Sequence, residues 1–238
     1  MNRIPVCEPC LAAPRAFVPE IFCARCGTPF LSAQRLDEEG LCRLCRTGAV
    51  EFEAAYSFGL YEGALRELIH LLKYEGVREL APRMGEWLAA ALPRGQRFDA
   101  IVPAPLHWWR KLRRGFNQSA LLARELGRRT GLAVEEGLLR RVRATPQQAN
   151  LPLAGRRKNV AGAFRVARPE RAAGKRLLLI DDVYTTGATL NACARALKKA
   201  GAAHVSTLTL ARVDRRPPRI EFAAAPAPSG HPHAGATA

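Results

Sequence analysis

Two adjacent carboxylates, Asp181 and Asp182, stand between an apolar run and a turn rich in hydroxyl groups and glycine. The carboxylates can accept hydrogen bonds from sugar hydroxyls or help to hold a metal ion. The turn that follows them can bind a phosphate through its backbone N–H groups and threonine hydroxyls, and its glycine lets the backbone approach closely. Its sequence is Thr185-Thr186-Gly187-Ala188-Thr189. The segment therefore predicts a site for a sugar that carries a phosphate.

The elements on either side place this segment at the edge of a sheet. The continuous apolar run Leu177–Ile180 is typical of a strand buried on both faces of a parallel sheet. Helical spacing follows, with Leu190, Cys193 and Leu197 on one face and Gly201 just beyond the end. A helix N-terminus at this edge favours a phosphate. An ordinary strand–turn–helix connection with exposed acids is the alternative.

This combination resembles the 5-phosphoribosyl-1-pyrophosphate (PRPP) motif of the type I phosphoribosyltransferases. The resemblance implies that Asp181 and Asp182 contact the ribose hydroxyls and that the loop from Thr185 to Thr189 wraps the 5′-phosphate. It also implies an α/β fold, a type I phosphoribosyltransferase-like parallel sheet flanked by helices. The chain contains no G-x-x-x-x-G-K-[ST] sequence, which argues against a P-loop ATPase or helicase.

Six of the seven cysteines form C-x-x-C pairs near the N-terminus: Cys7/Cys10, Cys23/Cys26 and Cys42/Cys45. The spacing of the second and third pairs matches a zinc pattern in which two pairs complete one tetrahedral site. We therefore expect these four thiolates to hold a structural Zn²⁺, with reduced free thiols or a redox disulfide as alternatives. Cys7 and Cys10 could compete for the same zinc, stay reduced, or belong to a site whose other half is missing.

A cysteine-rich N-terminus joined to a phosphoribosyltransferase-like segment resembles the ComF family of competence-associated proteins. Many members carry four cysteine pairs, and the three pairs of this chain raise the possibility that translation starts upstream. The resemblance implies a link to DNA uptake in natural transformation. It also implies PRPP with Mg²⁺ as ligands, and single-stranded DNA and a competence helicase as partners.

A second buried strand, Phe98–Val102, leads into a loop with many cations. Such a loop at the carboxyl end of a strand suits a pyrophosphate, which needs several N–H donors. The resemblance implies that Pro103 and Ala104 belong to the pyrophosphate loop and that Arg113 or Arg114 binds a phosphate. The alternative is a solvated basic turn.

The same loop contains other residues that could contact a ligand. The Arg-Gly-Phe-Asn-Gln sequence is a hallmark of the ComF resemblance, which assigns Asn117 and Gln118 to positioning of the substrate or the loop. Trp108 and Trp109 could stack on nucleic-acid bases, or pack against a neighbouring element.

A polar stretch from Thr145 to Asn159 lies between two short strand-like pieces, Leu138–Ala144 and Gly162–Val166. A long polar loop between two strands is a candidate lid. The resemblance matches it to the mobile catalytic loop of the family and makes Arg156 a catalytic residue.

Upstream, Ala55–Phe58 is a predicted strand, and the spacing from Ala64 to Leu72 predicts a helix that ends near Lys73. A lysine at a helix end is expected to interact with the helix dipole, and a position beside a phosphate is the alternative. His70 is expected to be a partly buried helix residue.

The chain of 238 residues has room for one α/β domain and a small module. We expect a cysteine-rich zinc-binding module at 1–53, a phosphoribosyltransferase-like domain at 54–214 and a disordered Pro/Ala-rich tail at 215–238. The formal net charge of +16 fits a polyanionic partner, or a basic surface that is merely solvated. We expect no membrane span and no secretory signal, which favours a cytoplasmic protein.

These features predict a PRPP-binding, phosphoribosyltransferase-like protein. If it is a transferase, the reaction is displacement at ribose C1 with release of pyrophosphate. The alternative is a non-catalytic competence factor that binds single-stranded DNA and uses PRPP only as a ligand.

Overall fold

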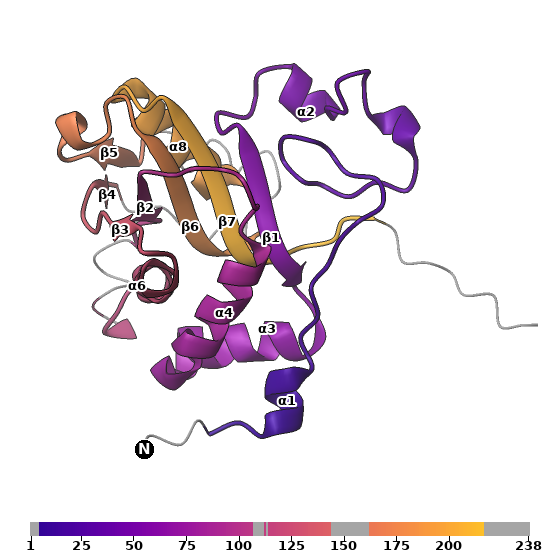
Figure 1. Ribbon diagram of the computed structural model, residues 1–238, viewed down its shortest axis with the longest axis vertical. Helices are drawn as coiled ribbons and strands as arrows, with labels where there is room; N and C mark the ends of the chain where they lie inside the picture. Colours follow the sequence, from indigo (N-terminus) through magenta and orange to yellow (C-terminus); the bar gives the residue numbers. More distant parts are fainter. Residues whose placement is uncertain (1–4, 107–111, 113, 144–161, 217–238) are drawn as a thin grey trace, which may run out of the picture.

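The computed structural model describes residues 5–106, 112, 114–143 and 162–216 (Figure 1). A five-stranded parallel sheet forms the centre of this part of the chain. In spatial order its strands are β1 (Ala54–Leu60), β7 (His204–Arg212), β6 (Arg176–Tyr184), β2 (Ala100–Pro103) and β3 (Ala133–Val134).

The central strand β6 has apolar side chains on both faces, because Leu177 and Leu179 pack in one core and Leu178 and Ile180 in the other. Leu177 to Ile180 of β6 are all buried, as expected for a central strand of a parallel sheet. β6 continues to Tyr184, so Asp181 and Asp182 are its residues rather than the start of the loop. The pairing of Asp181 with Thr209 and of Val183 with Ala211 on β7 extends the strand past the acids.

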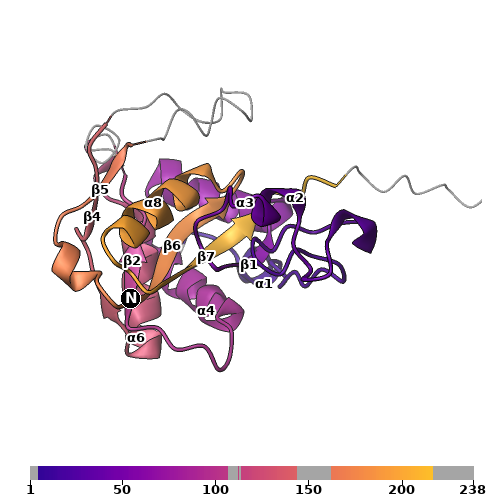
Figure 2. The ribbon, with the colours of Figure 1, turned by 90° about the horizontal axis from the view of Figure 1, so that it is seen from above.

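Helices lie on both faces of the sheet (Figure 2). α4 (Ala81–Ala91) packs on β1 and β7, and α6 (Gln118–Thr130) packs on β2 and β6. α8 (Ala188–Lys199) covers the other face, where it packs on β6 and β7. Two apolar cores result, one on each side of the sheet.

The remaining helical segments are short. α3 (Gly63–His70) continues into a π-helical turn, η2 (Leu71–Glu75), and the 3₁₀ turn η3 (Arg78–Leu80) precedes α4. His70 is exposed rather than partly buried, because Leu65, Leu68 and Ile69 form the inward face of α3. No helix in the described ranges combines the length and the apolar character needed to cross a membrane.

A two-stranded antiparallel sheet lies beside α8. It consists of β4 (Leu139–Arg141) and β5 (Phe164–Val166), and the 3₁₀ turn η5 (Pro169–Arg171) follows it. These strands fall within the two strand-like pieces predicted on either side of the polar stretch. The candidate lid itself, 145–159, lies outside the described residues.

The N-terminal segment packs along the free edge of β1 (Figure 1). It contains α1 (Glu8–Ala12), η1 (Ala33–Arg35) and α2 (Arg43–Arg46). The Phe17 N–H donates to the Phe58 carbonyl at 2.8 Å, and the Ala55 N–H donates to the Arg25 carbonyl at 2.8 Å. The segment therefore pairs with backbone groups that an uncovered edge strand would leave exposed.

Candidate functional site

A cavity of about 200 Å³ opens at the carboxyl end of β6. Residues from β6, from the loop after β2 and from the start of α6 line it, together with one residue from the π-helical turn. Parallel strands end at the same edge of a sheet, which is how these distant segments meet. The cavity brings together the predicted site residues Asp181, Asp182, Thr185, Thr189, Ala104 and Arg114.

Asp181 is held in place by two donors. Its Oδ1 accepts a hydrogen bond from the Ser119 hydroxyl at 2.9 Å and another from the Asp182 N–H at 3.0 Å. Burial raises the pKa of Asp181 to about 7, and the charge of Asp182 acts in the same direction, while Lys73 and Ser119 oppose the shift. Asp181 can therefore change protonation state near neutral pH.

Asp182 forms a buried ion pair with Lys73. The Lys73 Nζ lies 2.8 Å from Asp182 Oδ1, with the two side chains 13% and 7% exposed. Although burial disfavours its charge, the pKa of Lys73 is raised, because Asp182 and then Asp181 favour the ammonium. The expectation that Lys73 interacts mainly with its helix dipole is wrong, since its side chain leaves the helix end to reach the carboxylate. Asp182 Oδ2 is buried without a hydrogen-bond partner in the described structure.

The loop from Thr185 to Gly187 turns the chain from β6 into α8. Gly187 is the N-cap residue, with φ +70°, and the Ala188 N–H donates to the Thr186 hydroxyl at 3.2 Å. The positive φ explains why glycine stands at this position. The loop thus presents the N-terminus of a twelve-residue helix at the sheet edge, where an anion is favoured.

The predicted phosphate loop is divided between two cavities. Thr185 and Thr189 face the cavity of the acid pair. Thr186, Gly187 and Ala188 line a second cavity of about 200 Å³ on the other side of the turn. Tyr184, the last residue of β6, lines this second cavity too, and its ring packs so closely that a Cβ on Gly187 would lie 2.4 Å from the phenol oxygen.

The loop after β2 forms the opposite wall. Pro103 is the last residue of β2, and Ala104 follows it into the cavity. The Arg114 guanidinium lies 4.9 Å from the Tyr74 ring centroid and also borders the cavity. The sequence assigned phosphate binding to Arg113 or Arg114. Arg113 lies outside the described residues, as do Trp108, Trp109 and the proposed catalytic Arg156.

Asn117 and Gln118 have structural contacts at the start of α6. Asn117 is the N-cap, since its Oδ1 accepts from the Ser119 N–H at 3.1 Å and its Nδ2 donates to the Ala104 carbonyl at 3.1 Å. Gln118 is buried and lines the cavity. Asn117 therefore fixes the loop after β2 onto α6, the loop-positioning role that the sequence allowed.

Sequence reasoning did not identify two other cavity residues, Ser119 and Arg141. Ser119 could have been found only as part of the helix that begins beside it. Arg141 comes from β4, and its guanidinium lies 5.4 Å from the Phe164 ring centroid. Nothing local distinguishes it from the other arginines nearby, because its place at the site depends on how β4 docks against the main sheet.

The four predicted zinc ligands form one buried cluster. The sulfur atoms of Cys23, Cys26, Cys42 and Cys45 lie within 4.8 Å of one another. A tetrahedral site with Zn–S bonds of about 2.3 Å separates its sulfurs by about 3.8 Å. The Cys26–Cys42 sulfur distance of 3.7 Å fits this geometry. The four thiols also hydrogen-bond to one another, so that the pKa of Cys23 is lowered while the pKa values of Cys26 and Cys45 are raised.

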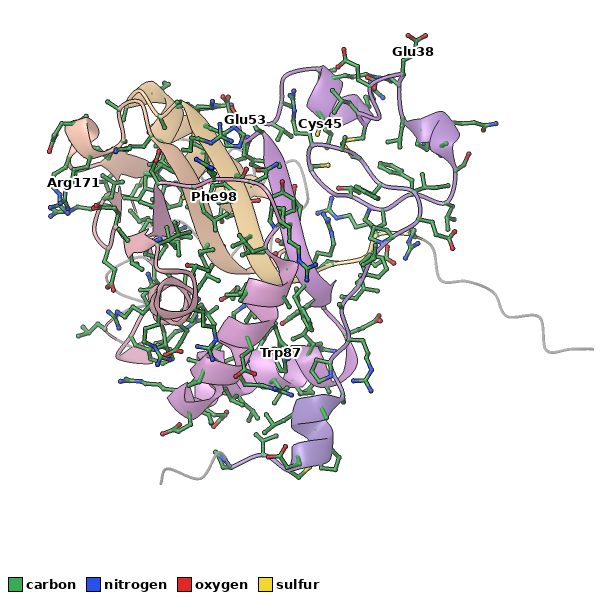
Figure 3. The ribbon with its side chains drawn as sticks, in the orientation of Figure 1. Glu38, Cys45, Glu53, Trp87, Phe98 and Arg171 are labelled. Carbon is green, nitrogen blue, oxygen red and sulfur yellow. The ribbon has the colours of Figure 1, made fainter. Side chains whose placement is uncertain are left out.

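The cluster packs directly against the sheet. Figure 3 shows Cys45 among the loops of the N-terminal segment, and the four cysteines share one apolar core with Phe52 and with Ala55 of β1. The buried Arg212 guanidinium, at the end of β7, donates to the Cys26 carbonyl at 2.9 Å and also to the Gly27 carbonyl. It stacks on Tyr184, with 5.0 Å between guanidinium carbon and ring centroid.

Cys7 and Cys10 lie outside this cluster. Cys7 is the N-cap of α1 and Cys10 belongs to that helix, and both are exposed. α1 lies far from α2 (Figure 1). In this arrangement the pair does not compete for the same metal, and a reduced pair or one half of another site remain as interpretations.

Comparisons with known proteins find a match to one family model and distant similarity to solved structures. The phosphoribosyl transferase domain model matches residues 112–225. The glutamine PRPP amidotransferase of B. subtilis aligns with 56% of this chain and 26% of its own, at 22% identity and a TM-score of 0.40. This chain therefore spans about a quarter of that protein. An adenine phosphoribosyltransferase from Thermoanaerobacter pseudethanolicus aligns over 60% and 83% of the two chains, at 20% identity and a TM-score of 0.35.

More extensive matches are found among curated proteins. DNA utilization protein YhgH of Salmonella typhimurium is 32% identical over 213 residues, which is 87% of this chain and 90% of that protein. Competence protein F of Haemophilus influenzae is 30% identical over 199 residues, with 80% and 84% covered. Competence protein ComFC of Streptococcus pneumoniae is 30% identical over 192 residues, with 80% of each chain covered.

Proposed function

The chain belongs to the ComF family, and on that basis we propose that it binds PRPP at the carboxyl end of β6 and transfers its phosphoribosyl group with release of pyrophosphate. The observation that carries the proposal is the single cavity shared by Asp181, Asp182 and the loop residues Thr185 and Thr189. Carboxylates suit a ribose diol and the helix N-terminus suits its 5′-phosphate, so one cavity matches both ends of the same ligand.

Each wall of the cavity has a role in the proposed reaction. Asp181 and Asp182 accept hydrogen bonds from the ribose hydroxyls and stabilise positive charge that develops at C1. The N-terminus of α8 holds the 5′-phosphate, and Arg114 on the opposite wall stabilises the leaving pyrophosphate. We also propose Arg156, which lies outside the described residues, as a catalytic residue, as the family resemblance implies.

Mg²⁺ fits as a companion of PRPP. The cavity contains carboxylate oxygens, one of them buried without a partner, and such oxygens together with phosphates are the ligands that Mg²⁺ prefers. When bound, Mg²⁺ would neutralise charge on the departing pyrophosphate. For the four-cysteine cluster we propose a structural Zn²⁺, supported by the number, type and spacing of its sulfur ligands.

Calorimetric titration with PRPP in Mg²⁺ tests the proposal. Wild-type protein should bind PRPP, and Asp181→Asn/Asp182→Asn should weaken binding by roughly a hundredfold, since hydrogen bonds to charged groups contribute strongly. Asp99→Asn is the matched control, because Asp99 accepts from the Arg176 N–H at the opposite end of the sheet. Wild-type protein that binds no PRPP would overturn the proposal. Release of pyrophosphate with candidate acceptors then tests the transfer step.

A second function, binding of single-stranded DNA, is favoured by a cationic groove beside the cavity. A space of about 510 Å³ is lined by Arg78, Arg140 and Phe116, and by Arg124, which is paired with Glu136 in the same lining. The Arg78 guanidinium lies 4.6 Å from the Phe116 ring centroid, so charge and an aromatic face occur together. In this proposal PRPP is only a ligand and the groove binds the strand.

Fluorescence anisotropy with a labelled oligonucleotide separates the two functions. Arg78→Ala/Arg140→Ala should weaken oligonucleotide binding and reduce its dependence on salt, while PRPP binding persists. Equal affinity of wild type and variant for the oligonucleotide would exclude the groove as the DNA-binding site. We also propose a competence helicase as partner, from the family resemblance, and a cytoplasmic location, which suits reduced thiolates. Affinity capture of that helicase and cell fractionation test these two points.

A further inference from the structure

Lys73 occupies the place beside Asp182 that a small cation would take. Its Nζ lies 2.8 Å from Oδ1, and both side chains are almost completely buried. The other carboxylate of the pair is held on its Oδ1 by the Ser119 hydroxyl and the Asp182 N–H. The acid pair therefore already contains one positive charge before any ligand enters the cavity.

The backbone of η2 delivers this lysine. α3 widens into a π-helical turn at Leu71–Glu75, and Gly76, with φ +70°, ends it. Leu72 in the same turn is fully buried, which fixes the turn against the core and leaves the next side chain facing the sheet edge. Single π-helical turns often occur at functional sites, since they redirect one side chain.

A divalent cation and the Lys73 ammonium cannot share the carboxylate at low cost. A Mg²⁺ ion binds a carboxylate oxygen at about 2.1 Å. Placed on Asp182 Oδ1, it would lie about 4 Å from the ammonium, at a distance where like charges repel strongly in a buried setting. On Asp182 Oδ2, which has no partner in the described structure, the cation would lie farther from the ammonium and the repulsion would be weaker, and it is removed altogether if Lys73 withdraws or loses its proton.

We propose that Lys73 is a specificity-determining residue that excludes free divalent cations from the acid pair. The pair then remains available to neutral hydroxyl groups, and metal enters only on the phosphates of a ligand. The second half of this statement rests on the proposed binding of PRPP. The first half concerns the ligand-free protein and stands on the ion pair alone.

Titration with Mn²⁺ in the absence of PRPP tests the exclusion directly, with free Mn²⁺ followed by electron paramagnetic resonance on protein whose zinc content has been measured. Wild-type protein should bind Mn²⁺ weakly at the acid pair. Lys73→Met should bind it roughly tenfold more tightly or better, because one buried positive charge is removed. Lys73→Arg, which retains the charge, should resemble wild type. Lys198→Met is the matched control, since it breaks an ion pair with Glu53 elsewhere on the protein.

A further variant assigns the new metal site. Adding Asp182→Asn to Lys73→Met should abolish the gain, whereas a gain that survives would place the metal elsewhere and overturn the proposal. Unchanged Mn²⁺ affinity in Lys73→Met would also overturn it. If Lys73→Met is unstable, Lys73→Gln should show the same gain in Mn²⁺ affinity. If neither neutral variant folds, the ion pair serves the stability of the protein and the proposal is overturned. Because PRPP is absent, these results do not depend on whether PRPP binds.

Discussion

Substitution of Gly187 by alanine should destabilise the protein for two reasons, a positive φ and a clash with a neighbouring ring. Gly187 has φ +70° and lies beneath the ring of Tyr184. An alanine Cβ there would lie 2.4 Å from the phenol oxygen and 2.6 Å from the adjacent ring carbon. Tyr184 is itself buried between Phe52 and the Arg212 guanidinium, so the ring has little room to move away.

The size of the effect can be divided into two parts. The left-handed conformation costs an alanine about 1–2 kcal/mol. Overpacking against a buried ring adds about 1–3 kcal/mol. Gly174 provides the matched control, because it has φ +69° while no atom lies within 4 Å of its Cβ position. We therefore expect Gly187→Ala to lower the free energy of unfolding by about 2–5 kcal/mol and Gly174→Ala by about 1–2 kcal/mol.

Urea unfolding followed by tryptophan fluorescence measures both variants. Gly187→Ala should also weaken PRPP binding, because the clash displaces the N-terminus of α8, whereas Gly174→Ala should leave it unchanged. The double variant Gly187→Ala/Tyr184→Leu should lose less free energy of unfolding than the two single variants lose together, because the smaller leucine leaves room for the alanine Cβ. Equal destabilisation by Gly187→Ala and Gly174→Ala would refute the contact with Tyr184 as the cause.

Three other predictions follow from buried polar groups. Arg212→Met should lower the free energy of unfolding by about 2–4 kcal/mol, because the Cys26 and Gly27 carbonyls lose their buried donor; a loss below about 0.5 kcal/mol in urea unfolding would contradict this. The pKa of Asp181 is raised from its ordinary value near 4 to about 7, so the protonated side chain stabilises the folded protein fully below about pH 4 and this stabilisation is lost as the pH rises through 7. Asp181→Asn should therefore flatten the pH dependence of urea unfolding between about pH 4 and 7, and an unchanged pH dependence would contradict this. Cys45→Ser should reduce bound zinc, measured by atomic emission, from about one per chain and lower the thermal midpoint; zinc content equal to wild type would count against the four-sulfur site.

The sheet edge and its loop were predictable because their signals are local. The apolar run Leu177–Ile180 predicted a buried strand, and the structure has it at the centre of the sheet. The strand nevertheless extends past the two acids, since β7 pairs with β6 as far as Tyr184. Sequence alone does not reveal that pairing, because Asp181 and Asp182 are poor strand formers and only tertiary contacts keep them extended.

Side chains that reach the site from other elements were harder to find. α6 was not predicted, and its first residues Gln118 and Ser119 are polar yet buried, which conceals the helical pattern of the residues that follow. Lys73 was placed correctly near a helix end, but its partner depends on the π-helical turn and on the packing of α3 against the sheet. A spacing rule for regular helices does not anticipate a turn of different pitch.

The predicted boundary at residue 53 separates segments that share one core. Cys26 and Cys45 pack in the same apolar cluster as Phe52 and Tyr184. Arg212 contacts the backbone of the cysteine turn on one side and Tyr184 on the other, and Tyr184 in turn packs against Gly187 of the phosphate loop. Each contact in this series is buried, so a shift of the cysteine turn must be accommodated at the loop. The cluster of four cysteines therefore contributes to the shape of the loop between β6 and α8 without contacting it, because it helps to fix the Tyr184 ring against which Gly187 packs.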